Sequence, residues 1–154
     1  RGLGDVYKRQ QYAHGNEPSH HIAHLYNYVG QPWRTQEIVD EVLHTLYFNN
    51  PDGLSGNEDC GQMSAWYILN AMGFYQVCPG KPVYSIGRPL FNEATVHLKD
   101  GKSFKVIAHN NSRDNKYVRS IVLNGNKLET PFFTHQDIVD GGTLELTMGS
   151  EPLK

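Results

Sequence analysis

The sequence of 154 residues has only two cysteines and no long apolar run. Cys60 and Cys78 flank a segment with a helical pattern, which would hold them farther apart than the roughly 7 Å that a disulfide spans. We therefore expect two buried free thiols, and a pair at this spacing makes no zinc motif. The longest apolar stretches are only a few residues, too short to span a bilayer. Residues 1–10 also lack the apolar region of a secretory signal.

An excess of charge of one sign is also missing. Fourteen basic residues face sixteen acidic ones, for a formal net charge of −2, so there is no basic footprint for nucleic acid. Fifteen glycines and eight prolines are ordinary numbers, which excludes collagen-like and low-complexity classes. With 38% apolar residues, the chain can build one modest core or two small subdomains, not a large enzyme.

The first ten residues differ in character from the rest. Residues 5–10 (DVYKRQ) match one reading frame of a transposon-end adapter used in DNA library preparation. We expect residues 1–10 to be non-native and exclude them from fold reasoning, the alternative being an ordinary N-terminal arm. On the first hypothesis, the natural start of the protein lies upstream.

Residues 11–76 show a helical period. Ser19 suits an N-cap before a first helix, with apolar residues recurring from residue 22 to 29 and Gly30 as a stop. A second, amphipathic helix is expected over residues 32–48, with Pro32 in its first turn. The third, over about residues 61–72, is apolar on nearly every side, which predicts that it is buried.

Residues 77–154 change to a period of two, as strands do. Asp100-Gly101 and Asn124-Gly125 are hairpin signals between alternating segments. We expect an antiparallel sheet of about five short strands, and hence an α+β chain with a helical part (11–76) and a β part (77–154). A helix that is apolar on nearly every side must be packed on all sides, and this chain has too few helices for that. The sequence therefore predicts a fragment of a larger domain.

Two polar segments stand where helices are expected to begin, residues 14–21 (HGNEPSHH) and 56–62 (GNEDCGQ). A helix dipole at this position favours an ionised Asp59, and an ionised carboxylate can activate water or hold Ca²⁺. Asp59 and Gln62 also have the spacing of a capping box, so a purely structural role is the alternative. Glu17, before Pro18, could equally be simple loop charge.

The histidines suggest zinc only weakly. His20 and His24 have the i, i+4 spacing of metalloprotease helices, but the glutamate of that motif is missing. We instead expect His20 or His21 to contact a ligand or a buried partner.

Both polar segments carry a family resemblance. Residues 12–21 (YAHGNEPSHH) and 53–67 (GLSGNEDCGQMSAWY) strongly resemble glycoside hydrolase family 92, the calcium-dependent exo-acting α-mannosidases. Residues 28–33 (YVGQPW), residues 73–75 (GFY) and Pro79-Gly80 fit the same family. The likeness covers residues 11–154 and does not extend to residues 1–10.

The resemblance implies a fold and a reaction. The fold is an (α/α)6 toroid of paired helices with β-sandwich elements, of which residues 11–76 would be an incomplete part and residues 77–154 the antiparallel β segment. The reaction is hydrolysis of terminal α-mannosides of glycans with inversion, with α-1,2 linkages favoured. An inverting site holds its two carboxyl groups about 6.5–9.5 Å apart, with water between base and sugar.

The resemblance also implies roles for individual residues. Asp59 corresponds to the general base, with Asn57 and Glu58 as neighbouring site residues. Glu17 and Asn16 correspond to the side that binds Ca²⁺, which would hold the mannose O2 and O3. The substrate-binding candidates are His14, His20 and His21.

Other parts of such an enzyme are expected outside the chain. The family's general acid is a glutamate upstream of residues 16–18, so the fragment alone should be inactive. The full-length protein is expected in the periplasm or outside the cell. The alternatives are another toroidal carbohydrate enzyme, such as a glucoamylase-like hydrolase or a phosphorylase, and a non-catalytic sugar-binding module in residues 82–154.

Overall fold

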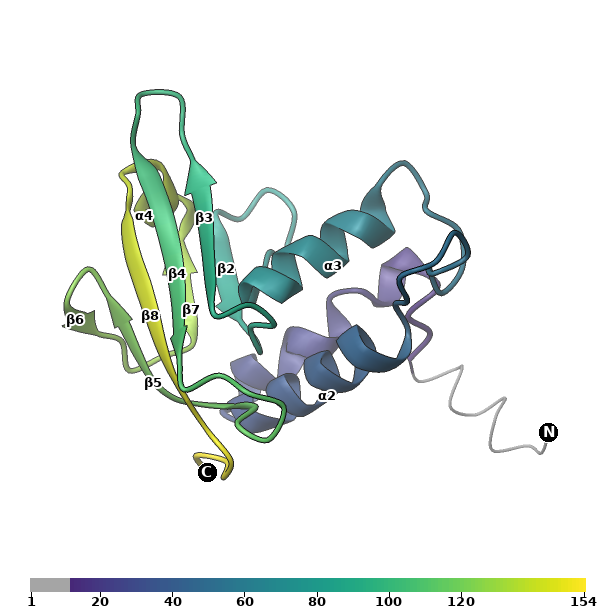
Figure 1. The fold of residues 1–154 in the computed structure, drawn as a ribbon, viewed down its shortest axis with the longest axis horizontal. Coiled ribbons are helices and arrows are strands. Elements are labelled where there is room, and N and C mark those ends of the chain that lie inside the picture. The colour runs from purple at the N-terminus through teal and green to yellow at the C-terminus, as the bar shows by residue number, and fades with distance from the viewer. Residues whose placement is uncertain (1–11) are drawn as a thin grey trace.

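The computed structural model describes residues 12–154, and the predicted non-native segment, residues 1–10, lies outside the described residues. The helices within residues 17–72 gather on one side of the molecule, and the sheets, with the short helix His135–Val139, lie on the other (Figure 1). This arrangement agrees with the predicted α+β class and its order along the chain, helices first and strands second. No helix within residues 12–154 combines the length and the apolarity needed to cross a membrane.

The first predicted helix is two 3-10 helices, η1 (Glu17–Ser19) and η2 (Ile22–Val29). The predicted cap was wrong, because His21 and not Ser19 precedes η2, and Ser19 ends η1 instead. Gly30 ends η2 in the left-handed conformation, with a φ of 73°, as expected of a glycine stop. The second helix, α2 (Pro32–Thr45), begins at the predicted proline.

The third helix, α3 (Gln62–Met72), has one buried face rather than the predicted complete burial. Trp66 is fully buried, whereas Ile68 is 51% exposed, because no described segment covers that side of α3. The cysteines on either side of α3 are free as predicted, but both are exposed, so the prediction of buried thiols was wrong. Each lies in a loop that faces away from the core.

A small antiparallel sheet that the sequence pattern did not predict follows α3. Its strand order is β1 (Phe74–Tyr75), β2 (Val83–Ile86) and β7 (Phe132–Thr134). A short helix, α4 (His135–Val139), follows β7, and Thr134 and Asp137 form a capping box at its start. The strands are only two to four residues long, too short for a period of two to show.

The five predicted strands form the second sheet, in the order β3-β4-β8-β5-β6. They are β3 (Glu93–His97), β4 (Ser103–His109), β5 (Tyr117–Leu123), β6 (Asn126–Lys127) and β8 (Gly142–Gly149). Both predicted hairpins are present, joining β3 to β4 and β5 to β6. The sheet is mixed, however, because β8 pairs with β4 in parallel, so the prediction of a fully antiparallel sheet was wrong. The chain passes through β7 and α4 before β8, which lets β8 enter in the same direction as β4.

Two apolar clusters form the core. One, around Trp66, joins η2, α2 and α3. The other, around Phe104 and Leu146, is formed by buried side chains from both sheets. Leu69 of α3 packs against both clusters. The helical and β parts are therefore packed together, and α3 is the element they share.

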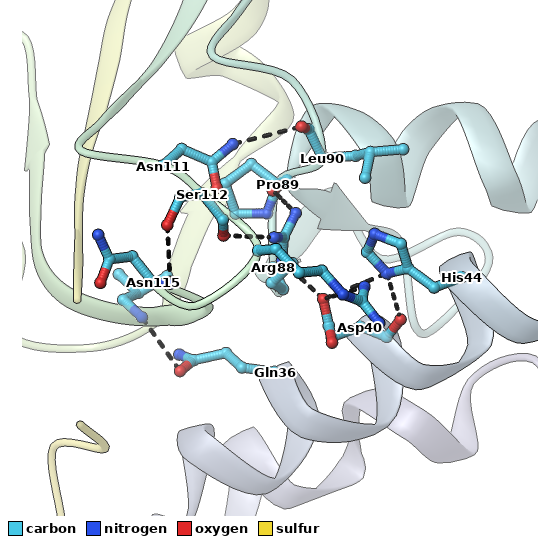
Figure 2. Close-up of polar contacts among 11 residues, drawn as sticks. Gln36, Asp40, His44, Arg88, Pro89, Leu90, Asn111, Ser112 and Asn115 are labelled. Carbon is cyan, nitrogen blue, oxygen red and sulfur yellow. Dashed lines mark hydrogen bonds and ion pairs between the residues drawn. The ribbon is translucent and has the colours of Figure 1, made fainter. Parts of the chain in front are cut away.

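Polar contacts also join the two parts. Figure 2 shows Arg88, which follows β2, reaching Asp40 on α2, with a distance of 3.0 Å between Arg88 Nε and Asp40 Oδ1. Arg88 also donates to the carbonyls of Pro89 (2.6 Å) and Ser112 (3.0 Å). Arg88 and Asp40 are only 2% and 6% exposed, so this is a buried ion pair at the junction.

Candidate functional site

The first polar segment is anchored by His14. Its ring is buried against Trp66 at a centroid distance of 4.3 Å, and its nitrogens lie 2.8 Å from the Tyr12 hydroxyl and 2.6 Å from the Tyr47 hydroxyl. Burial lowers the pKa of His14 to about 4, and the neighbouring His20 adds to the shift. Both nitrogens have protein partners, so His14 acts on the site by fixing the loop that follows it.

His20 connects this loop to α3. Its Nε2 donates to the carbonyl of His14 (2.9 Å), and its Nδ1 accepts from the Gln62 amide (3.1 Å), which defines the neutral Nε2–H tautomer. Gln62 also donates to the Tyr75 hydroxyl at 3.1 Å. Desolvation lowers the pKa of His20, which keeps the ring neutral. A buried protein partner for His20 was one of the two predicted outcomes.

The second polar segment leads into α3 through a loop with an unusual backbone. Asp59, Cys60 and Gly61 all have positive φ, at 47°, 59° and 89°. Gly61 is the N-cap of α3 and no side chain caps it. The alternative of a capping box formed by Asp59 and Gln62 is therefore wrong, because no side chain caps α3 and the Gln62 amide bonds to His20 and Tyr75. The Asp59 residue is exposed.

Glu58 takes the role that the pattern assigned to Asp59. Its carboxylate accepts a hydrogen bond from the backbone N–H of Ser64 (3.0 Å) and another from the Ser64 hydroxyl (2.7 Å). These two bonds lower the pKa of Glu58, the backbone bond more than the hydroxyl bond. Glu58, which directly precedes Asp59, thus holds the loop to the first turn of α3.

The two polar segments meet at Glu17 and Asp59. Their carboxyl groups lie within hydrogen-bonding reach, which raises the pKa of Asp59. The pKa of Glu17 is lowered, first by a backbone hydrogen bond and then by Asp59. Glu17 Oε1 is buried, and no other residue among those described donates a hydrogen bond to it. Two carboxyl groups in this position repel each other unless a proton or a cation lies between them.

The donor set fits a hard cation. Ca²⁺ prefers carboxylate, amide and carbonyl oxygens, which Glu17, Asp59 and the neighbouring Asn16 can offer. Within residues 12–154, no group of three or more His, Cys, Asp or Glu side chains gathers as a complete metal site. The orphaned Glu17 oxygen is the observation that fits a cation here.

A cavity of about 650 Å³ opens beside Glu17. Its size falls in the range of ordinary small-molecule sites. The residues that line it come from the first polar segment, from α3 and from β1 with the loop after it, and include Glu17, His20, His21, Gln62 and Tyr75. The lining does not include Asn57, Glu58 or Asp59. Asp59 contacts Glu17, which does line the cavity.

Of the predicted site residues, the structure brings Glu17, His20 and His21 to one cavity and places Asp59 beside Glu17. It adds two that the sequence pattern missed, Gln62 and Tyr75. Gln62 was interpreted as part of a capping box, so its bonds to His20 and Tyr75 were not predicted. Tyr75 lies in a two-residue strand that carries no signal of its own.

Comparison with known proteins gives this geometry a context. Residues 4–150 match the glycosyl hydrolase family 92 catalytic domain. A relative from Arthroderma benhamiae, named an uncharacterized secreted glycosidase, is 31% identical over 140 residues, which cover 89% of this chain and 18% of that protein.

Two solved structures from Bacteroides thetaiotaomicron are also similar. The family GH92 inverting mannosidase BT2199 is 47% identical with a TM-score of 0.87, over 97% of this chain and 20% of that one. The family GH92 α-mannosidase BT3965, in complex with mannoimidazole, is 45% identical with a TM-score of 0.87, over 91% of this chain and 18% of that one. This chain thus spans about a fifth of the length of these relatives. The match to the family domain runs through both polar segments and both sheets, and the chain belongs to glycoside hydrolase family 92.

Proposed function

We propose that this chain is part of an inverting, calcium-dependent exo-α-mannosidase that hydrolyses terminal α-mannosides of glycans, with α-1,2 linkages favoured. The observation that carries the proposal is the Glu17–Asp59 pair beside a cavity large enough for a sugar. The relatives support it, since two are named mannosidases and one of these is in complex with mannoimidazole.

In this proposal Asp59 is the general base. It takes a proton from a water molecule, whose oxygen attacks the anomeric carbon while the bond to the leaving group breaks. Glu58 and Asn57 shape the loop that presents Asp59, and the two bonds from Ser64 hold Glu58 in place. The general acid that protonates the leaving group is assigned to a glutamate well upstream of residues 16–18, so the 154-residue chain alone is expected to be inactive.

Glu17 and Asn16 are proposed to hold the calcium ion. When bound, Ca²⁺ would supply a positive charge that orients the mannose hydroxyls and offsets the repulsion between the carboxylates. His20 and His21 line the cavity, and His21 is the one assigned to substrate contact in this proposal. The ring nitrogens of His14 and His20 all have protein partners, so these two rings hold the loops that border the cavity.

We further propose that the helices are part of a larger (α/α)6 toroid. The exposed face of α3, with Ile68 at 51%, is consistent with further helices packing there. A periplasmic or secreted location is proposed for the whole protein. The name of the Arthroderma relative, a secreted glycosidase, supports this location.

The test uses the gene extended to its natural start. Hydrolysis of α-1,2-mannobiose is followed by proton NMR, with and without EDTA, to identify the anomer that is released first. Release of β-mannose that stops on adding EDTA and returns with added Ca²⁺ is the expected result. Release of α-mannose first, or hydrolysis that EDTA leaves unchanged, would contradict the inverting or the calcium assignment respectively.

A further inference from the structure

Two glycines mark the place where the polar segments touch. A Cβ atom added to Gly15 would lie 2.3 Å from the carbonyl oxygen of Ser55 and 3.1 Å from its carbonyl carbon. A Cβ atom added to Gly56 would lie 2.8 Å from the carbonyl oxygen of Gly15. The contacts on both sides are backbone atoms, which cannot turn aside as a flexible side chain can. The two loops therefore cross at the closest approach that glycine allows.

Each loop is also fixed on the far side of the crossing. In the first loop, the N–H of Asn16 donates to the carbonyl of Ala13 (2.9 Å), and His20 holds the carbonyl of His14. In the second, Glu58 is held by Ser64, and the N–H of Met63 donates to the carbonyl of Glu58 (3.3 Å). Because both loops are held, the distance between them at the crossing also fixes the distance between the residues that follow in each loop.

Glu17 follows Gly15 by two residues, and Asp59 follows Gly56 by three. We propose that Gly15 and Gly56 are positioning residues, whose backbone contact sets the separation of the Glu17 and Asp59 carboxyl groups and thereby the calcium affinity and the rate of the reaction. The inference rests on the proposed function for the roles of the two carboxylates. The crossing itself is a feature of the described backbone.

The size of the effect follows from the distances. Ordinary contacts of a Cβ atom begin at about 3.4 Å, so Gly15→Ala requires the loops to separate by about 1 Å. A displacement of this size at a reacting group can lower the rate about 100-fold. Gly15 does not have a positive φ, so alanine there adds the steric clash without backbone strain.

The experiment compares Gly15→Ala with wild type in the full-length protein. Gly149→Ala is the matched control, because its φ is also not positive and the nearest atoms to its added Cβ belong to the flexible side chain of Arg119, at 3.0 Å. Calcium affinity is measured by calorimetry and by the rise in Tm on adding Ca²⁺; kcat and KM are measured on mannobiose. We expect Gly15→Ala to lower kcat about 100-fold with little change in KM and to raise the calcium Kd about tenfold or more. Its calcium-free Tm should stay near that of Gly149→Ala.

Wild-type kcat and calcium Kd in a folded Gly15→Ala protein would overturn the inference. So would a loss of activity that only follows the folded fraction. If Gly15→Ala does not fold, Gly56→Ala is measured by the same criteria. Its control is then Gly101→Ala, because both glycines have positive φ, at 110° and 72°, and a Cβ atom at Gly101 meets nothing within 4 Å. Failure of both to fold would also overturn the inference, since the glycines would then serve the fold and not the spacing. A wild-type protein without mannosidase activity would defeat the proposed function, while the calcium measurements would still test the crossing.

Discussion

The carboxyl groups of Glu17 and Asp59 face each other from two separate loops, and each changes the acidity of the other. Glu17 raises the pKa of Asp59, and Asp59 contributes to the lowered pKa of Glu17. Two carboxyl groups this close to each other are stabilised by a proton or a cation between them.

The tie between Glu58 and Ser64 leads to a first prediction, on stability. We expect Glu58→Ala and Ser64→Ala each to lower Tm at pH 7. Glu58→Ala should lower it more, because it removes both hydrogen bonds, whereas Ser64→Ala removes only the bond from the hydroxyl and keeps the one from the backbone N–H. The double variant should lose little more than the larger single loss, since the two side chains act as one pair. Thermal melts followed by circular dichroism measure this.

The stabilisation by the Glu58–Ser64 contact should depend on pH, and the lowered pKa of Glu58 gives the direction. The stabilisation is present above the ordinary glutamate pKa and is lost as the pH falls through the lower, folded value. Strictly additive losses in the double variant would contradict a direct pair.

His24 gives a second prediction, on acid stability. It is fully buried; Ser85 lies 3.0 Å from its Nδ1, and its Nε2 donates to Asn70 at 2.8 Å. Burial lowers its pKa to about 4, against an ordinary value of 6.5. The unfolded chain binds a proton below pH 6.5 and the folded chain does not, so stability is complete above pH 6.5 and falls towards pH 4.

The loss attributable to His24 over this range is on the order of 3 kcal/mol. Urea unfolding at several pH values between 4 and 7 measures it. His24→Gln should flatten the pH dependence, although its buried amide lowers stability at pH 7. The exposed His97→Gln is the control and should leave the slope unchanged. An equal slope in wild type and His24→Gln would show that this ring is not the group that titrates.

The buried pair at the junction of the two parts gives a third prediction. Asp40→Leu leaves the guanidinium of Arg88 buried without its carboxylate, and we expect a loss of about 3–5 kcal/mol. The exposed pair of Glu93 and Lys105, 2.9 Å apart, supplies the control. Glu93→Gln should cost less than about 1 kcal/mol. Urea unfolding compares the two variants, and equal costs would show that the junction does not depend on the Arg88–Asp40 pair.

The sequence pattern predicted the long elements well and the short ones poorly. The helix α3 and the β3–β4 hairpin carry clear periodicity and turn residues, and both are present. Strands β1, β2 and β7 are two to four residues long and are stabilised by pairing with one another, which leaves no local signal. The parallel pairing of β4 with β8 depends on the path between them and not on either segment.

The site was predicted as two segments, and only the folded chain shows how they meet. The spacing of Asp59 and Gln62 favoured a cap by Asp59, but the backbone has positive φ at Asp59 and Cys60 and no side chain caps α3. Glu58 bonds to Ser64 instead, six positions along the chain, outside the spacing of the expected motif. The crossing of Gly15 and Gly56 depends on tertiary contact, which no pattern in either segment contains.

The most direct test of the account is the kcat of Asp59→Asn in the full-length protein. Asparagine keeps the size of the side chain and removes the charge that accepts the proton from water. We predict a fall in kcat of about 100-fold or more, with Tm unchanged, because Asp59 is exposed and caps no helix. The control, Asp52→Asn in the exposed loop before Gly53, should keep wild-type kcat. A folded Asp59→Asn enzyme with wild-type kcat would contradict the central claim that Asp59 is the general base.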